Sequence, residues 1–229
     1  MLIATSHVVA LLASLSLASG AAAPVQPPPP MIVNLSTAAK ISPTLLARVL
    51  AETDAIWRAN GFSFVWRRAA REVVPYARTS EAGPYLPSHL RVIIGNEIGV
   101  SHDHRTPLGW IAFDDDGGPM PEIYVSYENA RRLLEAARGV VGLASNMTAA
   151  QRELFLARAM GRALAHEMGH YLLASKVHTP RGLMQASRSA YEFFSTEQRS
   201  FRVDPAQQQT IAARLLRESL VVSRLESRD

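Results

Sequence analysis

Residues 166–184 read HEMGHYLLASKVHTPRGLM and contain the most informative motif of the sequence. His166 and His170 are four residues apart, so on an α-helix they lie on nearly the same face, one turn from each other. Two imidazoles in this arrangement can bind one metal ion, and Glu167 beside them can act as a general base toward a water molecule on that ion. The spacing therefore indicates the site of a zinc-dependent hydrolase.

The residues around this pattern favour a helix. Residues 151–173 contain no proline and are rich in Ala, Leu, Met, Glu and Arg, a composition that favours helix, and we expect Thr148 to cap the N-terminus. At four-residue spacing the sequence has one apolar stripe (Leu156, Met160, Leu164, Met168, Leu172) and one polar stripe (Arg158, Arg162, His166, His170). The two histidines are thus predicted to lie on the polar stripe, where a cleft can reach them.

A third imidazole follows at His178. In an unbroken helix it would lie about 12 Å along the axis from His170, at roughly 1.5 Å per residue, which is too far for one zinc ion. The helix must therefore end within residues 172–176 and the chain must turn back. Residues 171–177 contain no Gly or Pro, and Pro180 ends the helix at the latest. If the chain turns back in this way, His178 is the candidate third ligand.

These residues resemble the metzincin metallopeptidases, which include the matrixins and astacins. That family carries His-Glu-x-x-His-x-x-Gly-x-x-His, followed by a turn with a methionine below the metal. His166, Glu167 and His170 match the pattern, and Gly182–Met184 look like the methionine turn, with Met184 as its methionine. His178 comes two residues later than the family pattern requires.

The departure leaves the third ligand open. The family's glycine position falls on Leu173 and its third histidine position on Lys176, so His178 implies a longer connection after His170. In thermolysin-like enzymes a glutamate at a similar distance downstream is the third ligand, which makes Glu192 the alternative to His178.

The resemblance implies a secreted zinc-dependent endopeptidase acting on a peptide or protein substrate. One catalytic Zn²⁺ would be held by His166, His170 and His178, with the fourth position left for water. Glu167 would take the proton of this water, which attacks the peptide carbonyl. An exported metal- or peptide-binding module without useful turnover is the alternative, although a purely structural zinc site would not need Glu167.

Composition excludes several other chemistries. The chain has no cysteine, which rules out disulfides, cysteine-ligated zinc, a cysteine nucleophile and a propeptide that acts through a thiolate. The net charge of +4 includes only two lysines, and no dense basic run with interleaved aromatic residues is present. We therefore expect no nucleic-acid partner.

The N-terminus is typical of an exported protein. Residues 1–23 contain no charged side chain, have an apolar centre, and end in small residues, so we expect a cleaved signal peptide and a secreted or periplasmic protein without stable membrane insertion. No Lys or Arg stands near the start, and an uncleaved membrane anchor is the alternative. Residues 24–30 (PVQPPPP) predict a stiff spacer, and residues 31–229 a single catalytic domain.

The predicted fold class is α+β: a mixed, twisted sheet packed on the long metal-binding helix, with a C-terminal helix. Strands are expected at residues 31–36, 62–67, 90–94, 108–113 and 122–127, helices at 43–59, 129–138 and 205–220, and a loop at 75–88. This order also resembles the metzincin catalytic domain. In that family an edge strand lies along the cleft and pairs with extended substrate, and Leu108–Phe113 or Glu122–Tyr127 could supply it.

Weaker patterns were also considered. His102 and His104 flank Asp103 in a predicted loop and could hold a second, structural metal, although such loops are more often solvated. Asp114–Asp116 precede two glycines, which favours a plain turn over a calcium site. Tyr171 and Tyr191 are candidates to stabilise an oxyanion, with Tyr171 favoured as a packing residue.

Overall fold

The computed structural model describes residues 28–38, 40–68, 90–97 and 106–226. Its elements, in chain order, are β1 (Met31–Thr37), α1 (Pro43–Arg58), β2 (Phe64–Arg68), β3 (Arg91–Gly95), β4 (Gly109–Phe113), β5 (Pro119–Ser126), α2 (Tyr127–Ala136), α3 (Arg138–Val141), the 3₁₀ turn η2 (Ala144–Asn146), α4 (Ala149–Leu173), α5 (Ala190–Phe194), the 3₁₀ turn η3 (Arg199–Phe201) and α6 (Pro205–Glu226).

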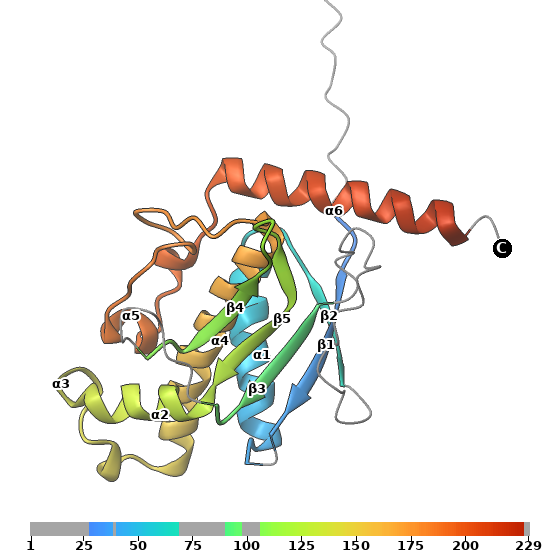
Figure 1. Cartoon of the computed structure of the whole chain (residues 1–229). Coiled ribbons are helices and arrows are strands. Elements are labelled where there is room, and N and C mark those ends of the chain that lie inside the picture. Colours follow the sequence, from blue (N-terminus) through green and yellow to red (C-terminus); the bar gives the residue numbers. More distant parts are fainter. Residues whose placement is uncertain (1–27, 39, 69–89, 98–105, 227–229) are drawn as a thin grey trace, which may run out of the picture.

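The strands form one mixed five-stranded sheet in the order β2-β1-β3-β5-β4 (Figure 1). β1, β2, β3 and β5 pair in parallel, and only β4 is antiparallel to its neighbour, β5. Asp114 closes the β4–β5 turn, because its carboxylate accepts a hydrogen bond of 2.6 Å from Gly118 N. A turn is therefore observed at the predicted place, and the strand order leaves β4 at the edge of the sheet.

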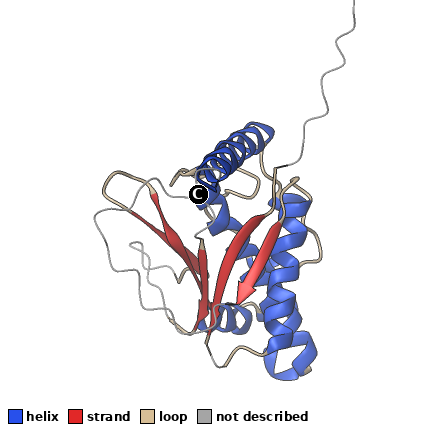
Figure 2. Ribbon diagram, turned by 90° about the vertical axis from the view of Figure 1, so that its right-hand side faces the viewer, coloured by secondary structure: helices blue, strands red, loops and turns tan. Residues whose placement is uncertain are grey.

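Helices α1 and α4 pack side by side against one face of this sheet (Figures 1 and 2). Alternate residues of β1 (Met31, Val33 and Leu35) point into the core that forms between the layers. α6 crosses one end of the molecule, and Ile211 in its first half is fully buried. A mixed α/β fold around the long helix was expected from the sequence and is observed.

α1 runs unbroken, although two polar residues interrupt its apolar stripe. The Thr53 hydroxyl donates to the carbonyl oxygens of Val49 and of Gly161 on α4, both at 3.0 Å. Glu52 accepts a hydrogen bond of 2.8 Å from Arg162 Nε on α4. Both interruptions are thus satisfied by α4, which the sequence alone could not show.

The predicted boundaries shift by a few residues. Helix α2 begins at Tyr127 rather than Asn129, because the Ser126 side chain accepts from Asn129 N and caps it. Residues 139–147 contain part of α3 and all of η2, and α6 extends past residue 220. The predicted leader (1–23), most of the spacer, the 75–88 loop and the His102–His104 pattern lie outside the described residues. In the described part of the chain, no helix is both long and apolar enough to span a bilayer.

Candidate metal centre

α4 presents the first two histidines as the sequence predicted. Thr148 caps the helix through a capping box with Gln151, since each side chain bonds the backbone N–H of the other residue. Twenty-five residues of continuous helix follow. His166 and His170 lie one turn apart near its C-terminal end, with ring centroids 4.7 Å apart.

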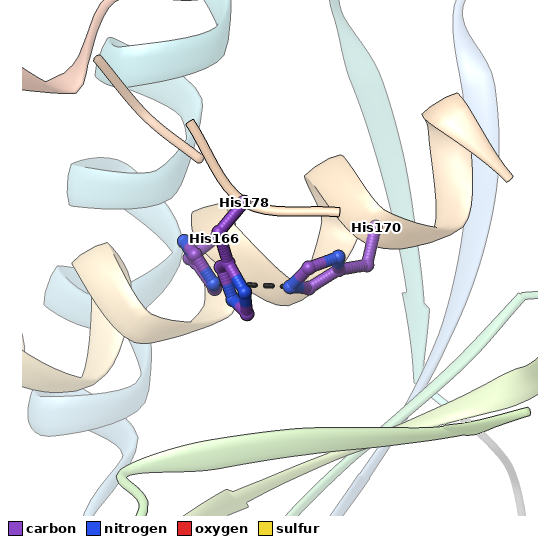
Figure 3. Close-up of side chains that lie close together, drawn as sticks. All are labelled: His166, His170 and His178. Carbon is purple, nitrogen blue, oxygen red and sulfur yellow. Dashed lines mark hydrogen bonds between the residues drawn. The ribbon is translucent and has the colours of Figure 1, made fainter. Parts of the chain in front are cut away.

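The helix then ends early enough for His178 to return. Leu173 is the last helical residue, and Ala174 adopts the left-handed conformation with φ of 49°. Ser175 N donates to the carbonyl oxygen of His170 at 3.2 Å, which closes the helix end without Gly or Pro. The chain doubles back, and the His178 ring lies 5.3 Å from that of His166 and 4.8 Å from that of His170 (Figure 3).

Backbone carbonyls hold the two helical imidazoles in one tautomer. His166 Nδ1 lies 2.8 Å from the carbonyl oxygen of Leu183, and His170 Nδ1 lies 2.7 Å from that of Ser175. Because a carbonyl oxygen can only accept, both Nδ1 atoms must carry the proton. The Nε2 atoms of the neutral rings are left with free lone pairs, which is the state that a metal ligand needs.

The Nε2 atoms of His166 and His170 face each other at 3.1 Å (dashed line in Figure 3). Two ligands at about 2.0–2.1 Å from one tetrahedral zinc ion are about 3.3 Å apart, so this pair fits a shared ion. One ligand atom each from His166, His170 and His178 can be chosen so that all lie within 4.8 Å of one another. The set of three is therefore close, although its upper separation is wider than in a loaded tetrahedral site.

Burial keeps these imidazoles neutral. Burial, together with the nearby His170, lowers the pKa of His166 to about 3. Burial also lowers the pKa of His170 and of His178. Protons therefore compete weakly for the ligand atoms near neutral pH.

Glu167 lies in the same cavity as the three histidines. Part of its side chain reaches the cavity surface, yet burial raises the pKa of its carboxyl to about 8. Gly109 of β4 makes room for it, because a Cβ atom at residue 109 would lie 3.1 Å from Glu167 Cγ. The edge strand can thus pass close to the Glu167 side chain.

The cavity has a volume of about 730 Å³. β4 forms one wall, from Gly109 to Phe113, and the chain around Gln185–Arg188 together with Phe193 forms another. Of the two strands that could line the cleft, β4 is the edge strand and β5 is interior. The free edge of β4 therefore lies beside the histidines.

Met184, the methionine of the predicted turn, lies against α4, the helix that carries His166 and His170. Its side chain is 1% exposed, and a Cβ at Gly169 would lie 2.3 Å from its sulfur. Gly182 takes the positive φ of 82° that the turn requires. Thr179 N donates to the Met184 carbonyl at 2.9 Å and closes the loop that carries His178.

Comparisons with known proteins add little to this geometry. A scan against protein-family models gives no match, and neither does a search of curated proteins. The search of solved structures does find similarity. One similar structure is archaemetzincin from Methanopyrus kandleri, with a TM-score of 0.48 and 16% sequence identity over 82% of this chain and 96% of that one. A similarity of this extent does not establish a shared function, so function must be inferred from the site itself.

Glu192, the alternative third ligand, has other partners. Its carboxylate accepts from the backbone N–H and the hydroxyl of Ser189, at 3.0 Å each, and from Arg188 at 3.1 Å. Among the described residues, the group that can hold a metal contains His178 and does not contain Glu192. The geometry thus favours His178.

The structure also places residues that the pattern did not single out as functional. Arg162, predicted on a cleft-facing polar stripe, has a side chain that is 0% exposed. It donates to the carbonyl oxygens of Glu192 and Ser195 as well as to Glu52. Its spacing of four residues from His166 places it on the same helix face, but this spacing does not indicate its acceptors, which come from distant segments. No pattern in the sequence indicates the roles of Gly109 and of the Leu183 carbonyl.

The two tyrosine candidates do not line the cavity. Tyr171 is fully buried, with Arg214 Cζ 5.6 Å from its ring centroid, and it is a packing residue as favoured. Tyr191 is 60% exposed and does not line the cavity. Lys176, at the family's third-histidine position, lines the cavity with its ammonium 5.2 Å from the Phe113 ring centroid.

Proposed function

We propose that this chain is a zinc-dependent endopeptidase in which His166, His170 and His178 hold one zinc ion. The observation that supports this most directly is the meeting of three imidazole ligand atoms within 4.8 Å in a cavity that also contains Glu167. When bound, a zinc ion supplies a Lewis acid and brings the pKa of a coordinated water toward neutrality.

Glu167 is proposed as the general base. Its raised pKa of about 8 belongs to the metal-free protein, and a nearby cation favours the carboxylate over the acid. With the site loaded, Glu167 would accept the proton of the attacking water near neutral pH and return it to the leaving amine. A metal site that serves structure alone has no need of such a carboxylate.

β4 is proposed to hold the substrate. It is the edge strand of the sheet and lines the cavity beside the histidines. An extended peptide can pair with such an edge through main-chain hydrogen bonds, whatever its sequence. This arrangement would carry a peptide carbonyl past Glu167, which supports a peptide substrate over a small amide.

The test combines metal analysis with hydrolysis of a peptide library by the full chain. We expect about one zinc per chain in the wild type and in Glu167→Gln, with turnover lower by about 10²–10⁴-fold in the variant. Glu197→Gln is the matched control, because Glu197 is exposed and does not line the cavity. Zinc-free wild-type protein, or full turnover in Glu167→Gln, would contradict the proposal. Bound zinc without hydrolysis of any peptide would point to a binding module.

We further propose that residues 1–23 direct export and are removed. N-terminal sequencing and fractionation of the expressed protein test this step. A mature chain that begins near residue 24 outside the cytoplasm is the expected result. An intact N-terminus in the membrane fraction would instead indicate an uncleaved anchor.

A further inference from the structure

Arg188 lies between the methionine turn and α5, and its side chain is 4% exposed. One terminal nitrogen donates to the carbonyl oxygens of Gly182 and Ser200, the second at 3.0 Å. The other donates to the Glu192 carboxylate at 3.1 Å. The guanidinium carbon lies 4.0 Å from the ring centroid of Phe201. A single buried side chain thus joins the methionine turn, α5 and η3.

The turn depends on these contacts, because it has little regular structure of its own. Leu183 N donates to the carbonyl oxygen of Arg202 at 2.8 Å, so the segment around η3 supports the turn from one side. A side chain at Gly182 would meet the same oxygen at 2.7 Å. Arg188 supplies the second support, by fixing the Gly182 carbonyl and η3 relative to each other.

The next carbonyl along the turn is the acceptor for a metal ligand. Leu183 O accepts from His166 Nδ1 at 2.8 Å and lies 3.5 Å from the same Arg188 nitrogen that bonds Gly182. The position of this oxygen determines which nitrogen of His166 carries the proton and how the ring is turned. Arg188 is thus one contact away from His166.

We propose that Arg188 is a positioning residue of the metal centre, which holds the Leu183 carbonyl and through it the tautomer and orientation of His166. The proposal deepens the proposed function and rests on it for the identity of the metal. It also gives Glu192 a role, because this carboxylate anchors Arg188 rather than binding the metal itself.

A simpler role would be to fasten α5 to the body of the protein. Arg158 provides the matched control for that role, since it donates to the carbonyl oxygen of Phe194 at 2.9 Å and no hydrogen bond joins it to Gly182 or Leu183. If Arg188 were only a fastener, removing either arginine would have the same consequences. If Arg188 positions the ligand, only its removal would change His166.

The experiment compares Arg188→Met, Arg158→Met and the wild-type full chain. Long-range ¹H–¹⁵N spectra of the metal-free protein report the protonated nitrogen of each histidine ring, with His166→Gln to assign the signals. Competition with a chelator gives the zinc affinity, and thermal unfolding reports folding.

In Arg188→Met we expect the two nitrogen signals of His166 to move toward the average of both tautomers. We also expect zinc affinity to fall by about ten- to hundredfold, the usual effect of losing an outer partner of a metal ligand. Arg158→Met should lower the unfolding temperature while keeping the His166 signals and the affinity. Wild-type signals and affinity in folded Arg188→Met would overturn the proposal.

If Arg188→Met does not fold, Arg188→Lys decides. A compact ammonium cannot span Gly182, Ser200 and Glu192 together, so we expect a smaller change in the same direction, and unchanged His166 signals would contradict the proposal. The spectra need no metal. A wild-type chain that binds no zinc would therefore defeat the proposed function, while the role of Arg188 would still be decided.

Discussion

The sulfur of Met184 packs directly on the backbone of Gly169, so closely that a Cβ atom at residue 169 would lie 2.3 Å from it. Glycine in a helix interior ordinarily costs about 1 kcal/mol relative to alanine. Here the absence of a side chain is what lets the methionine turn reach the metal-binding helix. Gly169 therefore lowers the stability of the helix but permits the contact between Met184 and the helix backbone.

Gly169→Ala should therefore destabilise the protein despite the better helix propensity of alanine. Overpacking of a filled core costs about 1–3 kcal/mol, and the propensity gain offsets only part of it. Urea unfolding of Gly169→Ala and of Gly139→Ala makes the comparison, because a Cβ at Gly139 meets no atom within 4 Å. Loss in the first variant should be partly recovered by adding Met184→Ala, and equal stability of both single variants would contradict this account.

Gly109→Ala should impair turnover more than zinc binding. The added Cβ would lie 3.1 Å from both Glu167 Cγ and the Tyr124 carbonyl oxygen, so either the carboxylate or the edge strand must move. A displacement on the order of 1 Å can cost about 100-fold in rate. We expect kcat to fall about 10–100-fold while the zinc content stays near that of the wild type. A drop confined to zinc content would show that residue 109 does not act through Glu167.

Glu52→Ala should be strongly destabilising. Its partner Arg162 has a fully buried side chain, and removing one member of a buried ion pair costs about 3–5 kcal/mol because the other charge is left uncompensated. Glu135→Ala serves as the control, since Glu135 pairs with Arg131 on the exposed face of α2, where such pairs contribute little. Similar denaturation midpoints for the two variants would argue against a structural role for the Glu52–Arg162 pair.

The stability of the metal-free protein should change with pH through the three histidines and through Glu167. The pKa values of His166, His170 and His178 are lowered in the folded state, so below about 6.5 the unfolded chain binds more protons and stability falls with falling pH. The pKa of Glu167 is raised from 4.5 to about 8. Its contribution is fully present below pH 4.5 and declines up to about pH 8.

Between pH 4.5 and 6.5 the histidines and Glu167 act in opposite directions. Above pH 6.5 the contribution of the histidines fades, and the decline in stability up to about pH 8 is expected from Glu167. Denaturation of chelator-treated protein across pH 4–9 measures the curve. Glu167→Gln should lose the decline between pH 6.5 and 8 while keeping the acid limb. A variant with the same alkaline decline as the wild type would assign that limb to another group.

Zinc should stabilise the folded chain through His178. A ligand that binds only the folded state adds about 2.7 kcal/mol at a concentration 100 times its Kd. Chelation should therefore lower the unfolding temperature of the wild type, and added zinc should restore it. We expect zinc to raise the unfolding temperature of His178→Ala much less than that of the wild type. At high zinc, the rise in Glu192→Gln should match that of the wild type. The reverse pattern would make Glu192 the third ligand.

Local patterns were sufficient to predict the parts of this fold that depend on neighbours in sequence. The cap at Thr148, the proline-started helix after Ser42 and the helix end before Ser175 follow from backbone hydrogen bonding and from the reach of one metal ion. The strands were predicted to within a few residues because side chains alternate between the core and the surface, as in β1.

What the sequence could not show depends on contacts between distant residues. Glu52 and Thr53 look like flaws in an amphipathic helix until Arg162 and the Gly161 carbonyl are placed beside them. The choice of β4 over β5 as the edge needs the strand order, which no local pattern contains. The role of Arg188 has no sequence pattern, because its acceptors are mostly main-chain oxygens, which residues of every type supply.

Main-chain oxygens are also the acceptors for two of the proposed metal ligands, His166 and His170. The direct acceptors of both helical imidazoles are backbone oxygens, those of Ser175 and Leu183. Substitution at these two positions changes no acceptor as long as the path is kept. The side chains at positions 175 and 183 can therefore vary without loss of these two acceptors, provided that the contacts that fix the chain path, such as those of Arg188 with Gly182 and Ser200, are kept.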